Sequence, residues 1–83
     1  MITTQSTAPK TIARNATRKI AALKAQLTVC HSYSLSGGFI ATQIDPAWGW
    51  SQFEAGMAKL IDEGNGTYRM RFHSNHWLQY RAA

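Results

Sequence analysis

Apolar residues recur along the first third of the chain at the spacing of an amphipathic helix. Between Pro9 and Leu27 they follow one another at intervals of three or four residues, and a proline suits the first turn of a helix. This spacing predicts a helix over residues 9–27. Its buried stripe would be Ile12, Ala16, Ile20, Leu23 and Leu27, and its solvent side would hold Lys10, Arg14, Arg18 and Lys24.

A strand pattern follows, with alternating side chains from Thr28 to Leu35. Gly37-Gly38 is typical of a hairpin turn, because glycine reaches the positive φ angles that tight turns require. A two-residue turn there predicts three opposed pairs: Leu35 with Ile40, Tyr33 with Thr42, and His31 with Ile44. These pairs would place the apolar side chains of both strands on one face.

A second helix is predicted to begin at Ser51, because Ser51 and Glu54 have the spacing of a capping box. Asp45-Pro46 ends the preceding strand pattern, and Gly64 suits the end of this helix. The buried stripe of the helix would be Phe53, Met57, Leu60 and Ile61. Two tryptophans just before it, Trp48 and Trp50, are expected to cover the core.

The C-terminal residues predict a second hairpin, formed by 67–73 and 77–81. A three-residue loop over 74–76 pairs Phe72 with Leu78 and Met70 with Tyr80, whereas a two-residue turn would split the apolar set between two faces. We therefore prefer the three-residue loop. It predicts an outer face formed by Arg69, Arg71, His73, Trp77, Gln79 and Arg81.

These elements predict an α+β fold of order αββαββ, with two helices packed on one face of a four-stranded, mainly antiparallel sheet. A chain of 83 residues gives one domain, residues 1–83, of which residues 1–7 are expected to fray. The single cysteine, Cys30, excludes an internal disulfide framework and fits a reducing compartment. No apolar run reaches the length of about 20 residues that a membrane span needs. We therefore expect a cytoplasmic protein that does not bind a membrane.

The net charge of +5 is unevenly distributed. Residues 45–83 hold four acids and four bases, whereas the bases of residues 1–44 have no acid beside them: Lys10, Arg14, Arg18, Lys19 and Lys24. Such a face could contact nucleic-acid phosphates or an acidic protein surface. The alternative is an ordinary solvated helix face.

Residues capable of catalysis or metal binding are present but poorly placed. Cys30 and His31 are adjacent in a strand, so their side chains point to opposite faces. His73 and His76 lack further ligands for a zinc site. The chain contains no nucleophile elbow, phosphate-binding loop or dinucleotide fingerprint. We therefore expect no enzyme, no catalytic residue, no metal and no cofactor.

Two surfaces are candidates for partner binding. One is the basic helix, with Arg14 and Arg18; the other is the outer face of the terminal hairpin, with its tryptophan and arginines. Tryptophan and arginine are enriched at interface hot spots, and an exposed tryptophan can also stack on a single-stranded base. The residues expected to contact the partner are Arg69, Arg71, Trp77, Arg81, His73, Arg14 and Arg18. In the alternative, the first helix or a homodimer partner covers this outer face.

The segments DPAWGWSQFEAGMAKLIDEG and GTYRMRFHSNHW form an aromatic-led, capped helix that runs into a terminal hairpin. In this general character, over its C-terminal half, the chain resembles small phage-encoded anti-CRISPR proteins. The resemblance implies a non-enzymatic inhibitor that binds a bacterial CRISPR-Cas effector complex by protein–protein contact in the host cytoplasm. Because the chain is basic, it would bind an acidic protein surface or a site near guide RNA. The alternative is a small basic domain that binds RNA or single-stranded DNA.

Overall fold

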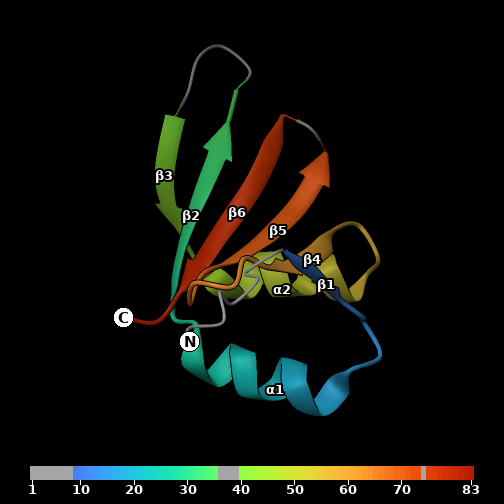
Figure 1. Ribbon diagram of the computed structural model, residues 1–83. Helices are drawn as coiled ribbons and strands as arrows, with labels where there is room; N and C mark the ends of the chain where they lie inside the picture. The colour runs from blue at the N-terminus through green and yellow to red at the C-terminus, as the bar shows by residue number, and fades with distance from the viewer. Residues whose placement is uncertain (1–8, 36–39, 74) are drawn as a thin grey trace, which may run out of the picture.

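The computed structural model describes residues 9–35, 40–73 and 75–83. In these residues the elements are β1 (Lys10–Ile12), α1 (Thr17–Gln26), β2 (Val29–Ser34), β3 (Ile40–Ile44), α2 (Pro46–Glu54), β4 (Lys59–Asp62), β5 (Tyr68–His73) and β6 (His76–Arg81). The strands form one antiparallel sheet of order β1-β4-β5-β6-β2-β3 (Figure 1). The predicted α+β class is confirmed, but the described sheet has six strands rather than four.

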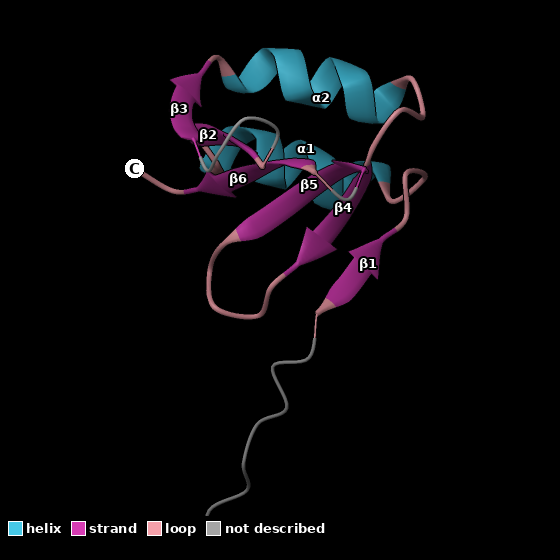
Figure 2. Cartoon of the chain, turned by 90° about the horizontal axis from the view of Figure 1, so that it is seen from above, coloured by secondary structure: helices cyan, strands magenta, loops and turns pink. Residues whose placement is uncertain are grey.

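Both helices pack on the same face of this sheet. The sheet contributes five side chains that are fully buried: Cys30, Leu60, Met70, Leu78 and Tyr80. They lie in one core with Ile20 and Leu23 of α1 and with Trp50 and Phe53 of α2. Figure 2 shows α2 running along this face, and Lys24 of α1 forms an ion pair with Glu54 of α2. The opposite face carries neither of the described helices.

The prediction of a helix over residues 9–27 is wrong in its first part. Lys10–Ile12 forms the edge strand β1, which pairs with β4, and α1 begins only at Thr17. Ile12 has the spacing of a helical stripe with Ala16 and Ile20, but its buried side chain reaches the core from the strand β1. Pairing with the edge of β4 outweighs this local pattern. Lys10 and Arg14 therefore do not belong to the helix.

The prediction that the second helix begins at Ser51 is also wrong. The helix begins at Pro46, where Asp45 caps it by accepting a hydrogen bond from the Ala47 amide (3.0 Å). Ser51 lies inside the helix and donates to the carbonyl of Trp48. The buried helical stripe predicted beyond residue 54 does not form, because Leu60 and Ile61 lie in the strand β4, Lys59–Asp62.

The first hairpin differs from its predicted register by one residue. Cys30 is opposite Ile44, His31 is opposite Gln43, and Tyr33 is opposite Ala41. A shift of one residue exchanges the two faces, so Cys30 lies in the core, whereas His31 and Tyr33 lie on the other side. β2 also pairs with β6, so a second neighbour fixes its register. The Gly37-Gly38 turn, like the expected fraying of residues 1–7, falls outside the described residues.

The terminal hairpin keeps the predicted faces except at His73, and it does not have the predicted pairs. The predicted register has His73 on the outer face, but it pairs with His76, which alternates with Trp77 along β6 and therefore lies on the helix side of the sheet. Met70 is opposite Leu78 and Tyr68 is opposite Tyr80, a shift of two residues that leaves the apolar side chains facing the core. Arg71 pairs with Trp77, and the next pair along is His73 with His76. Between them β5 has one residue more than β6, which is a β-bulge at Phe72. Because of this bulge, Met70 pairs with Leu78 rather than with Gln79, and the apolar side chains of both strands face the core.

Tyr80 connects the first turn of α2 to the middle of the sheet. Its hydroxyl donates to the carbonyl of Pro46 at 2.6 Å, and its ring contacts Trp50, with the centroids 4.9 Å apart. The helix approaches closely here because Gly49 has no side chain. A Cβ at Gly49 would overlap the Tyr80 hydroxyl and lie 2.5 Å from Cδ1 of Leu78.

We therefore predict that Gly49→Ala destabilises the protein by about 1 to 3 kcal/mol, although alanine is the better helix former. The added methyl group forces α2 away from Tyr80. Urea denaturation followed by circular dichroism measures the change. Ala47→Gly, at an exposed position of the same helix, is the matched control and should cost at most about 1 kcal/mol. An unchanged or raised midpoint for Gly49→Ala would contradict the close approach.

Candidate functional site

The face of the sheet turned away from the helices is the candidate site, and we call it the outer face. Its side chains lie in cross-strand rows over four neighbouring strands. One row comprises Lys59, Arg71, Trp77 and Tyr33, and the next comprises Ile61, Arg69, Gln79 and His31. Both helices contribute to the core on the other side, so neither covers these rows.

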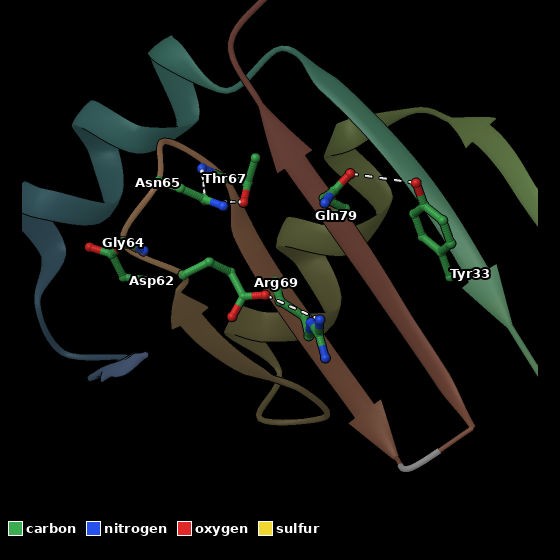
Figure 3. A network of polar contacts seen from close by, with 8 residues as sticks. Tyr33, Asp62, Gly64, Asn65, Thr67, Arg69 and Gln79 are labelled. Carbon is green, nitrogen blue, oxygen red and sulfur yellow. Dashed lines mark hydrogen bonds and ion pairs between the residues drawn. The ribbon is translucent and has the colours of Figure 1, made fainter. Parts of the chain in front are cut away.

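Two aromatic rings form the centre of the outer face. Trp77 and Tyr33 stand opposite each other on β6 and β2, and their rings are nearly parallel, with centroids 5.7 Å apart. The guanidinium carbon of Arg69 lies 5.3 Å from the centroid of the Trp77 ring, within cation–π range. Tyr33 also donates to the side-chain oxygen of Gln79 at 3.5 Å (Figure 3). The rings are half-buried, and they contact each other as well as Arg69 and Gln79.

Arg69 is held from a second side. Glu63, the first residue of the loop that joins β4 to β5, accepts from it at 3.1 Å; a dashed line at Arg69 marks an ion pair in Figure 3. This loop is ordered by its own side chains, because Asp62 accepts from the Gly64 amide and Asn65 accepts from the amide and hydroxyl of Thr67. The loop therefore positions the carboxylate, and the carboxylate positions Arg69 over Trp77.

Lys59 and Arg71 form an uncompensated pair of positive charges beside this centre. They stand directly opposite each other on β4 and β5, an arrangement that destabilises a sheet. The four carboxylates of the chain act elsewhere. Asp45 caps α2, Glu54 pairs with Lys24, Asp62 accepts from Gly64, and Glu63 pairs with Arg69. An anionic partner would remove the repulsion between these two charges.

The structure brings some of the predicted contact residues together and separates others. Arg69, Arg71 and Trp77 are neighbours on the outer face, and Arg81 follows at the end of β6, opposite Val29. His73 lies beyond the bulge, where its ring contacts His76 (centroids 5.8 Å apart). The structure places Arg14 and Arg18 apart from this face. Arg14 precedes α1 and its guanidinium lies against Gly56, while Arg18 is in the first turn of α1.

Sequence reasoning missed Tyr33 and His31 as outer-face residues. The predicted hairpin register turned both toward the core, although their strand neighbour Cys30 is the residue that lies there. A signal was available in the small side chains of Cys30 and Ser32, which suit the side of a strand that packs closely against other elements. The aromatic pair that centres the outer face therefore emerges only when β2 and β6 are seen side by side.

Cys30 is fully buried, and burial raises the pKa of its thiol to about 11. Few thiolates therefore form near neutral pH, and the adjacent His31 lies on the opposite face of the sheet. Burial, with the neighbouring His73, lowers the pKa of His76, whose Nε2 lies 3.1 Å from the Ser32 hydroxyl. Within the described part of the chain, no three His, Cys, Asp or Glu residues are grouped to hold a metal ion.

The raised pKa of Cys30 predicts a loss of stability at alkaline pH. The thiol is protonated in both states below its ordinary pKa of 9.0, but above that value only the unfolded chain readily releases the proton. The contribution of Cys30 to stability should therefore be unchanged up to about pH 8.5 and be lost progressively between pH 9 and 11. Burial raises the pKa of Tyr80 as well, which extends the fall to higher pH.

Urea midpoints measured from pH 7 to 11 test this expectation, and Cys30→Ala should make the decline shallower. In the unchanged chain, the Cys30 thiol should react with a disulfide reagent at pH 8 far more slowly when folded than in urea. The reason is that each unit by which the pKa rises lowers the thiolate fraction about tenfold. Equal rates in the two states would contradict the buried position of Cys30.

None of the described helices is both long and apolar enough to cross a membrane. Comparisons of the chain with protein-family models, curated proteins and solved structures find no match. The interpretation of the outer face therefore depends on its own geometry and charge.

Proposed function

We propose that this chain is a small non-enzymatic binding protein that docks on a protein partner through its outer face. The observation that supports this most is the Trp77–Tyr33 pair with Arg69 over it, on a sheet face that neither described helix covers. Tryptophan, tyrosine and arginine dominate interface hot spots. Strands hold these side chains, so little conformational entropy is lost when a partner binds.

The charge of the face supports an acidic surface on that partner. Lys59, Arg71 and Arg81 extend from the aromatic centre, and none of them is in an ion pair within the described residues. Complementary charges of this kind mainly accelerate association and select among partners. A second copy of the chain carries the same positive charges on this face, which disfavours a homodimer through the outer face.

A subunit of a bacterial CRISPR-Cas effector complex is the partner that we propose to test first. The resemblance to anti-CRISPR proteins supports this choice, and it makes the chain an inhibitor acting in the host cytoplasm. The basic outer face then favours an acidic surface on the effector rather than mimicry of DNA.

We predict that Trp77→Ala weakens partner binding by more than about 2 kcal/mol, which is about 30-fold, because it removes the centre of the contact. Biolayer interferometry with purified effector complexes measures this loss. Arg18→Ala, on α1, is the control and should bind as the unchanged chain does. Circular dichroism should show an unchanged fold for both variants. Normal binding by a folded Trp77→Ala variant would eliminate the outer face as the contact.

Binding of RNA or single-stranded DNA is a second candidate function. The observation that favours it is an aromatic pair on adjacent strands flanked by arginines, since bases stack on such rings while phosphates contact the cations. The segment Tyr68–His73 does not supply this platform, because Tyr68 packs against the core and Phe72 stacks with Trp48. The candidate platform is Trp77 with Tyr33.

If nucleic acid is the partner, single-stranded oligonucleotides should quench tryptophan fluorescence at low salt. The logarithm of the binding constant should fall with the logarithm of salt concentration by about 0.7 per phosphate contacted. Arg71→Glu should lower this slope, whereas Lys19→Glu on α1 should change it little. Absence of binding at about 50 mM salt, where electrostatic contacts are strong, would eliminate this candidate.

A further inference from the structure

A groove adjoins the outer face where the bulged end of β5 meets the turn between α2 and β4. Its volume is about 420 Å³, and its walls include Met57, Lys59, Arg71, Phe72 and His73. We call it the Met57 groove. Lys59 and Arg71 belong both to this groove and to the outer row that contains Trp77, so the groove continues the proposed docking surface.

The apolar part of the groove combines one exposed, adaptable side chain with one fixed ring. The Met57 residue is 63% exposed, although its thioether side chain is apolar. The Phe72 ring is held by two stacked neighbours, Trp48 at 5.4 Å and His76 at 5.0 Å between centroids. Methionine adapts to apolar side chains of different shapes and is frequent at surfaces that bind peptides.

The polar part of the groove is cationic and has no acid of its own. Lys59 and Arg71 repel each other across β4 and β5, and each of the four carboxylates of the chain acts elsewhere. His73 is the third polar wall residue and adds no negative charge. An anionic ligand would therefore gain attraction from Lys59 and Arg71 and would also relieve their repulsion.

The groove favours a peptide over a nucleotide as that anionic ligand. Phe72 already stacks with Trp48 and His76, so its ring is poorly available to a base. The apolar contact that remains exposed is Met57, whose flexible thioether is typical of surfaces that bind the apolar side chains of peptides. We propose that the Met57 groove binds an acidic segment of the partner protein that carries one apolar side chain. This inference rests on the proposed function, in which the outer face contacts a protein.

The experiment is a titration of the ¹⁵N-labelled full chain with a short synthetic peptide, acetyl-Asp-Glu-Leu-Asp-Glu-amide. We expect amide shifts that saturate and that concentrate at Met57, Ala58 and Phe72. The matched peptide with glycine in place of leucine should bind at least about fivefold more weakly, since it has no apolar side chain to bury against Met57.

Two groove variants separate the apolar contribution from the electrostatic one. Met57→Ser should reduce affinity for the leucine peptide at least about threefold but leave the glycine peptide unaffected, because only the apolar contact changes. Lys59→Glu with Arg71→Glu should abolish binding of the acidic peptide and favour a lysine-containing counterpart. Lys19→Glu on α1 is the charge control and should retain full binding.

Three outcomes would overturn the inference. They are no saturable shifts at low salt, equal binding of the leucine and glycine peptides, and tighter binding of a single-stranded oligonucleotide than of the peptide at the same amides. The proposed function is judged separately, by the effect of Trp77→Ala on the effector complex. A partner that needs Trp77 but tolerates both groove variants would refute the groove and leave the docking face intact.

Discussion

The hydrogen bond from the buried Tyr80 hydroxyl to the Pro46 carbonyl is the contact on which the two-layer arrangement depends. It fixes the start of α2 over the central strand β6, where Gly49 allows the backbone to come close. Trp50 and Phe53 are thereby brought onto the sheet, and α1 joins them through the shared core and the Lys24–Glu54 ion pair. A buried hydroxyl without this acceptor would cost stability, so the hydrogen bond also favours a single position of α2 on the sheet.

Because α2 and α1 lie on the same side, the two faces of the sheet differ in character. One face is closed by both helices and holds the apolar core. The other is left with the side chains that alternate with that core, and in the central strands these are Tyr33, Trp77, Arg69 and Gln79. An antiparallel sheet can tolerate solvent on one face. The proposed function uses the chemistry that this asymmetry leaves exposed.

The class of the fold and the outward position of Arg69, Arg71 and Trp77 could be predicted from the sequence, because strand alternation depends only on neighbouring residues. The first strand could not, since Lys10–Ile12 forms β1 only through pairing with the distant β4. The same holds for Tyr33, whose face is fixed by pairing of β2 with β6 as well as with β3. The predicted start of α2 at Ser51 is five residues too late, because the prediction interprets Asp45-Pro46 only as the end of a strand and not as a cap followed by the first helical residue.

The bulge at Phe72 divides the β5–β6 hairpin into two parts that lie against different neighbours. On the stem, a substitution such as one at Trp77 alters the flat face of the sheet. At the tip, Phe72 and His73 turn toward α2 and the following loop instead. One extra residue thus allows a single strand to contribute to two surfaces that share Lys59 and Arg71 at their border, so a substitution at either of these charges alters both surfaces at once.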